Sequence, residues 1–122
     1  ERRGSPSSLS DLAEHDIIGP DRNRSDLALA ERLGPAVSRD RLAVRTDSHP
    51  AQLAAARAGL GIAVTQIPVG EDDPHLVRLL PDTEIATLET WIVSHENLAH
   101  VPRVRAVFDS FVESFRTLSR RR

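Results

Sequence analysis

The stretch that decides the fold is RLAVRTDSHPAQLAAARAGLGIAVTQIPV, which runs from Arg41 to Val69. Its first six residues alternate as a short strand does, and the alanine-rich segment that follows has high helix propensity. Asp47 or Ser48 can cap that helix, and Gly59 is a natural left-handed stop. The apolar GIAV that follows is typical of a parallel strand covered on both faces. The stretch therefore predicts a right-handed unit of strand, crossover helix and strand.

The remaining chain predicts further strands and helices in alternation. HDIIG predicts a strand at residues 15–19, and Ser25 can cap a short helix that ends near Gly34. IATLETWIVSH, at residues 85–95, is the longest strand candidate. A final helix is expected to begin at Pro102. Its apolar residues recur at three- and four-residue steps, which predicts a core-facing stripe made of Val104, Val107, Phe108, Phe111, Val112, Phe115 and Leu118.

Composition limits the classes of function. The chain has 122 residues, a net charge of −2, 3% aromatic residues and no cysteine. The low positive charge and scarce aromatic side chains argue against a nucleic-acid surface within this segment. Without cysteine there are no disulfides or thiol nucleophiles, which agrees with a reducing compartment. No apolar run is long enough to span a membrane, so the expected location is the cytoplasm.

Histidines in SHENLAH suggest a zinc-protease helix, but their spacing does not fit one. His95 and His100 are five residues apart, which places them about 140° apart around a helix axis. Two histidines that share a metal from one helical face need a spacing of four, with Glu96 as the base. The favoured interpretation is a strand-to-helix turn with exposed histidines, although a metal site built with distant residues stays open.

Other short motifs also favour structural roles. GEDDP lacks the ligand spacing of a calcium loop and predicts a solvated turn. Asp47, Ser48 and His49 are adjacent, whereas a charge-relay triad is assembled from distant positions, so capping explains them better. GLG follows a helix and lacks the third glycine of a dinucleotide fingerprint. We therefore predict no catalytic residue, no metal and no cofactor, and a protein that is not an enzyme.

Binding is the remaining class of function. Loops that leave the strand ends of an open α/β sheet commonly hold small ligands. Residues 19–23 and 65–68 leave predicted strands in this way. In the second segment, Thr65 and Gln66 put two polar side chains at the end of an apolar strand, where they either cap the strand or face a cavity.

In this order and spacing, three segments resemble the effector-binding domain of LysR-type transcriptional regulators: RTDSHPAQLAAARAGLGIAVTQIPV, LVRLLP, and LETWIVSHENLAHVPRVRAVFDSFVESF. RRGSPSSLSDLAEHDIIG resembles the segment that enters the second lobe in one branch of that family. The resemblance covers roughly Arg3 to Phe115. It implies an α/β fold like that of type 2 periplasmic binding proteins, in which a small molecule binds between two lobes.

The resemblance also implies a division of the chain. Residues 1–84 would form most of the second lobe, residues 85–118 would supply a returning strand and the C-terminal helix of the first lobe, and residues 119–122 would be a disordered basic tail. Family members carry an N-terminal winged helix-turn-helix, which binds DNA and is absent from this sequence. Because half of the first lobe is also absent, we expect the phenylalanine stripe to pack against a remnant sheet or a second copy of the chain.

Inducer contacts carried over from the family fall on the two loops. Arg22 could bind a carboxylate in bidentate fashion or be an ordinary solvated arginine, and Thr65 and Gln66 could orient a ligand through neutral hydrogen bonds. The implied effector is an organic acid or an aromatic compound, sensed by a homo-oligomer. Alternatives are a solute-binding protein of similar fold and, with less support, a metal-dependent hydrolase. The complete set of implied contacts is Gly19, Pro20, Asp21, Arg22, Asn23, Thr65, Gln66 and Ile67.

Overall fold

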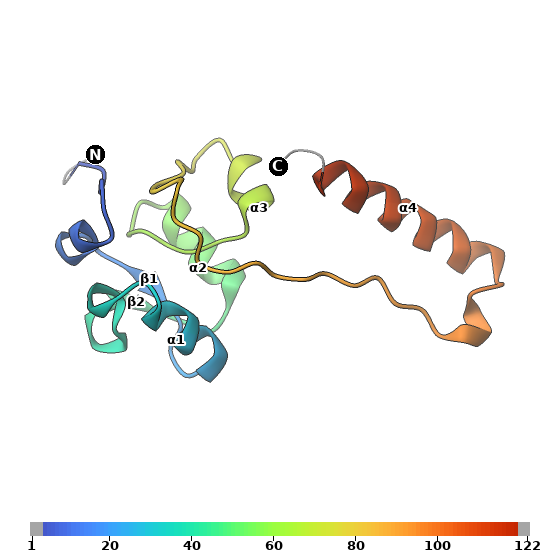
Figure 1. The fold of residues 1–122 in the computed structure, drawn as a ribbon, viewed down its shortest axis with the longest axis horizontal. Helices are drawn as coiled ribbons and strands as arrows, with labels where there is room; N and C mark the ends of the chain where they lie inside the picture. The colour runs from blue at the N-terminus through green and yellow to red at the C-terminus, as the bar shows by residue number, and fades with distance from the viewer. Residues whose placement is uncertain (1–3, 120–122) are drawn as a thin grey trace. The chain divides into compact units, whose positions relative to one another are not determined.

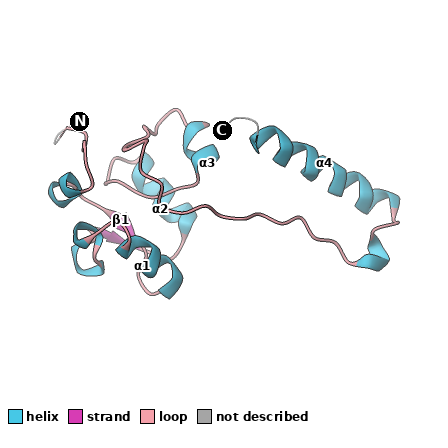
Figure 2. Ribbon diagram, viewed as in Figure 1, coloured by secondary structure: helices cyan, strands magenta, loops and turns pink. Residues whose placement is uncertain are grey.

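The computed structural model describes residues 4–119 and divides the chain into two units, Glu1–Thr87 and Leu88–Arg122. The first unit contains two short strands, three α-helices and several turns of 3-10 helix. The second contains one turn of 3-10 helix and one long α-helix. Figure 1 follows the chain through these elements, and Figure 2 shows how little of it is strand.

A small parallel sheet organises the first unit. Strand β1 (Ile18–Gly19) pairs in parallel with β2 (Val44–Arg45). Next to β1, Ile17 forms a parallel bridge with Ile62, where the amide of Ile18 donates to the Ile62 carbonyl at 2.8 Å. The first predicted strand and the crossover helix are confirmed, whereas GIAV is not a strand, because only Ile62 pairs and it does so in an isolated bridge. Strand β2 is shorter than the strand predicted at residues 41–46.

Helix α2 (His49–Arg57) is the crossover, and its ends form as the sequence predicts. The Ser48 hydroxyl accepts from the Ala51 amide at the N-terminus. Gly59 has φ of +73°, and the amides of Gly59 and Leu60 donate to carbonyls of the last turn at 2.9 and 3.1 Å. This pair of bonds is the Schellman arrangement, which satisfies carbonyls that a helix end leaves unpaired.

Helix α1 (Arg24–Glu31) begins two residues earlier than a cap at Ser25 would allow. Asn23, rather than Ser25, is the N-cap, and its side-chain oxygen accepts from the amides of Ser25 and Asp26. The prediction of Ser25 as the cap was wrong; asparagine and serine both cap helices well, so propensity does not favour Ser25 over Asn23. Asn23 therefore belongs both to the cap of α1 and to the β1–α1 loop.

The core lies against the sheet on the side that Ile17 faces. It is a cluster of buried side chains contributed by 3-10 turns and loops around β1, namely Leu12, Ile17, Leu33, Val37 and Leu42. Alternation along the strand points Ile18 to the opposite face, and α2 contacts β1. Ile18 is only 2% exposed, so both faces of β1 are covered as expected for a parallel strand. The 3-10 turns are η1 (Ser10–Glu14), η2 (Pro35–Val37) and η3 (Arg39–Arg41).

The segment after Ile62 differs from the prediction in two respects. A short helix, α3 (Ile67–Glu71), follows the Thr65–Gln66 pair. The GEDDP segment is not a fully solvated turn, because the Asp73 side chain is 2% exposed and forms an ion pair with Arg57 of α2. The Asp73 carboxylate also accepts from the His75 amide at 3.0 Å, a bond that lowers the pKa of this buried carboxyl group. A buried carboxylate needs such partners.

The second unit does not form the strand predicted at residues 85–95. Its first residues pair with no strand among residues 4–119, and Trp91 is 78% exposed. A 3-10 turn, η4 (Glu96–Leu98), is capped by His95 and leads to helix α4 (Pro102–Ser119). The α4 stripe is not the buried core that its spacing predicted, since Phe111 is 54% exposed.

No helix in the described part of the chain is long and apolar enough to cross a bilayer. Of the basic tail predicted at residues 119–122, Ser119 is the last residue of α4, and residues 120–122 lie outside the described residues.

We predict that Gly61→Ala lowers the free energy of unfolding by about 2 kcal/mol, because a β-carbon there would overlap the Asp16 carbonyl oxygen. Gly59→Ala is the matched control, because a β-carbon there meets no atom within 4 Å. Its loss of stability should be about 1 kcal/mol, which is the strain of alanine in the left-handed backbone conformation. Urea denaturation measures both. Equal losses for the two variants would contradict the close approach of Gly61 to Asp16.

Candidate ligand-binding site at the carboxyl edge of the parallel strands

The site begins where the three parallel segments end. Parallel strands direct their carboxyl ends to one edge of a sheet, and ligands of open α/β folds bind outside that edge. The loop after β1, the start of α2 after β2, and residues 63–66 after Ile62 all leave this edge. The fold thus directs both predicted loops to a common edge.

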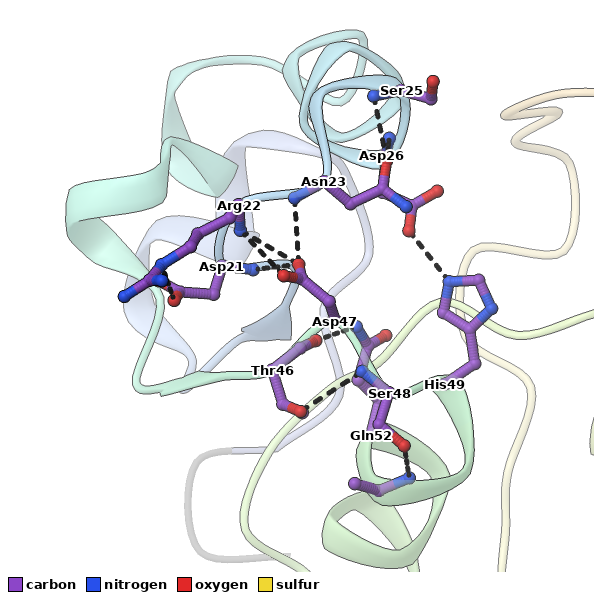
Figure 3. A network of polar contacts seen from close by, with 11 residues as sticks. Asp21, Arg22, Asn23, Ser25, Asp26, Thr46, Asp47, Ser48, His49 and Gln52 are labelled. Carbon is purple, nitrogen blue, oxygen red and sulfur yellow. Dashed lines mark hydrogen bonds and ion pairs between the residues drawn. The ribbon is translucent and has the colours of Figure 1, made fainter.

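A single carboxylate organises the β1–α1 loop. Asp47 accepts hydrogen bonds from the backbone N–H groups of Asp21, Arg22 and Asn23, at 2.8, 2.9 and 3.0 Å to its Oδ1 atom. The amide of Arg22 also reaches Oδ2 at 3.2 Å. Figure 3 shows the three amides converging on this one side chain. Successive N–H groups that converge in this way form an anion-binding concavity.

These bonds also set the charge state of Asp47. Donation by the Asn23 amide, followed by that of Arg22, lowers the pKa of the Asp47 carboxyl group from its ordinary value of 3.8. The bonds favour the ionised form because a carboxylate accepts N–H donors more strongly than a neutral carboxyl group does. Asp47 is therefore an anion at neutral pH.

Asp21 is also engaged within the protein. Arg39 donates to the Asp21 carbonyl oxygen and to its carboxylate, both at 2.7 Å. The Arg22 side chain lies 3.3 Å from the same carboxylate, yet it is 86% exposed. Arg22 can therefore turn toward a ligand at little cost, whereas Asp21 is held in place by Arg39.

Two further contacts fix α2 beside the loop. The His49 Nε2 atom lies 2.9 Å from Oδ2 of Asp26, which joins the first turns of α2 and α1. The buried Gln52 side chain donates to the Thr46 carbonyl at 2.6 Å. Figure 3 shows that these contacts flank Asp47 on the α2 side. The position of Asp47 thus depends on both helices and on the end of β2.

Residues of the second predicted loop are exposed. Gln66 occupies the N-cap position of α3, but its side chain makes no capping hydrogen bond. Thr65, Gln66 and Ile67 all present their side chains to solvent. Among residues 4–119, no hydrogen bond joins this loop to residues 19–23. The role of these three residues in ligand binding stays a prediction.

The first two residues of the predicted contact set are buried. Gly19 and Pro20 are buried where the loop faces the core. A β-carbon on Gly19 would lie 2.9 Å from the Leu42 side chain. Sequence reasoning assigned Asp47 only to helix capping and so missed its contact with residues 21–23. The available signal was its position directly after a predicted strand, where side chains of neighbouring strands converge.

A shallow hollow lies along α4, lined by Ala106, Val107, Ser110 and Phe111, and it shares no residue with the predicted loops. Within the described part of the chain, no three side chains of the kinds that bind metal come together.

Comparison with protein families identifies the class of protein to which the chain belongs. The family model for the LysR substrate binding domain matches residues 1–116. The chain therefore belongs to the LysR substrate binding domain family, as its ordered motifs suggested, and this supports a role in binding small molecules. No match to the chain was found among curated proteins or among solved structures.

We predict that Asp47→Asn destabilises the protein at neutral pH and that its difference from the unchanged protein disappears in acid. The folded-state pKa is depressed, so the stabilisation is fully present above the unfolded value of 3.8 and is lost as pH falls through the lower folded value. Denaturant unfolding at several pH values measures the difference. Asp11 and Asp73 also have lowered pKa values, but both proteins retain them, so their effects cancel. A difference that is constant with pH would contradict the assignment.

Proposed function

We propose that this chain is the effector-sensing module of a LysR-type bacterial transcriptional regulator. The observation that carries the proposal is the family match over residues 1–116. The parallel arrangement supports it, because both predicted contact loops leave the sheet at the edge where ligands of α/β folds bind. The module binds a ligand and performs no chemistry on it.

The proposed ligand is a small organic acid or an aromatic compound that contacts exposed side chains of this edge. Arg22 is exposed and has a planar guanidinium, which suits a carboxylate. Gln66 is exposed and makes no capping bond, so its amide can donate to and accept from a ligand. The second face of the cleft belongs to the first lobe of the type 2 periplasmic-binding-protein fold.

Signalling follows from a population shift. An effector that binds one arrangement of the lobes more tightly changes the balance between arrangements, by no more than the difference in its affinities. The regulator's DNA contacts are made by a winged helix-turn-helix domain outside this chain, and the regulator acts in the cytoplasm. A solute-binding protein and a metal-dependent hydrolase remain the alternatives, and neither has a specific observation in its favour.

A ligand test follows for the regulator with its DNA-binding domain. We expect a thermal-shift screen of small acids and aromatic compounds to find a stabilising ligand. Gln66→Ala should raise the dissociation constant of that ligand about tenfold. Gln52 is unsuitable as a comparison because it is buried, so Thr117→Ala on α4 serves as the matched control. A ligand whose binding is unchanged by Gln66→Ala would place the site elsewhere.

We further propose that the regulator is a homo-oligomer in which α2 lies close to a neighbouring copy. Ala51, Ala54 and Ala58 are exposed at steps of three and four residues. This spacing places them along one side of the helix, and their small side chains permit close approach of another helix. The family resemblance is what assigns oligomerisation to this region.

Ala54→Arg should weaken self-association of the regulator by about tenfold or more, because a guanidinium would be buried without a partner. Ala28→Arg, on the exposed side of α1, is the matched control and should leave association unchanged. Sedimentation analysis over a range of concentrations measures the effect. If both variants associate like the unchanged regulator, α2 is not the contact surface.

A further inference from the structure

The Asp47 carboxylate occupies the backbone groups that would otherwise receive a ligand anion. Three consecutive N–H groups converge on it from Asp21, Arg22 and Asn23. Beyond Arg24, the amides of Ser25 and Asp26 donate to the Asn23 side chain. The amides of these five residues at the start of α1 are therefore occupied by acceptors from the chain itself.

We propose that Asp47 is a specificity-determining residue of this edge, which keeps ligand carboxylates away from the β1–α1 loop backbone. The inference rests on the proposed sensing function and deepens it. With Asp47 in place, these three amides are not open to an anionic effector group, whereas the exposed Arg22 side chain can still bind one. Neutral polar groups are not repelled in the same way.

Charge and geometry both support this role. A second anion at the three amides would have to displace the Asp47 carboxylate, and a carboxylate beside it would be repelled. Asp47 cannot readily move away, because it lies between the end of β2 and α2, where Ser48 caps the helix and Gln52 holds the Thr46 carbonyl. Asp21 adds a second negative charge to the loop, which Arg39 balances.

Other charged groups around the loop do not replace Asp47. Asp26 accepts from His49 at the neighbouring helix end, and it makes no hydrogen bond to the loop amides among the described residues. Arg22 and Arg39 are cations, so they cannot accept from N–H groups. Asp47 is thus the carboxylate whose removal would open the three amides to an external anion.

The test uses the full chain and formate, which has the size and charge of the missing group. In the unchanged protein, the amide ¹H and ¹⁵N resonances of Asp21, Arg22 and Asn23 should shift together with a midpoint below pH 3.8. In Asp47→Ala that shift should be absent. Formate at neutral pH should then return the three resonances toward their original positions in a saturable titration.

Several controls make the outcome decisive. Formamide has nearly the shape of formate without its charge and should not restore the resonances. Asp40→Ala removes an exposed carboxylate from another turn and should not create a formate response. In the unchanged protein, formate should bind at this loop at least about tenfold more weakly than in Asp47→Ala.

A formate response of equal strength in both proteins, or no response in a folded Asp47→Ala protein, would overturn the proposal. So would equal effects of formate and formamide. If Asp47→Ala fails to fold, the pH titration is repeated with Asp47→Asn. In that variant the resonances of the loop amides should no longer shift with pH. None of these results depends on finding the effector, so a failed ligand screen and a failed role for Asp47 can be told apart.

Discussion

The structure of the first unit depends on the close approach of residues 61–62 to the segment that enters β1. The Ile62 amide donates to the Asp16 carbonyl at 2.9 Å, and only glycine at position 61 leaves room for that carbonyl. The approach places a parallel neighbour on one side of β1, while β2 lies on the other. This arrangement sends three chain segments out at the same edge of the sheet.

Hydrophobic burial and strand pairing both hold this sheet together. The two strands have two residues each, and a single hydrogen bond contributes about 1 kcal/mol net. Burying one isoleucine side chain contributes about 2 kcal/mol, and both Ile17 and Ile18 are almost fully buried, on opposite faces. Polar contacts then determine the positions of the loops. Asp47 is central to them, because one side chain satisfies three backbone groups of a loop that lies far away in sequence.

The sequence predicts local features of this protein better than those that depend on distant residues. The end of α2 at Gly59 is local and was predicted, and its cap, Ser48, is one of the two adjacent residues that the sequence offered. The contact of Asp47 with residues 21–23 and the burial of Asp73 by Arg57 bring distant residues together, so no periodicity reveals them. The strand predicted at residues 85–95 requires a neighbouring strand, which the described residues do not supply. The predicted ligand contacts rest on the family resemblance, not on packing.

Amide hydrogen exchange across the three parallel segments tests this account most directly. The amides of Ile18, Ala43, Thr46 and Ile62 donate to carbonyls of neighbouring segments, so they should exchange far more slowly than those of residues 88–93. Slow exchange at all four positions would establish that the segments pair on both sides of β1. Fast exchange of Ile18 and Ile62 in an otherwise folded unit would contradict it, because residues 65–67 would then have no fixed place at the proposed ligand-binding edge.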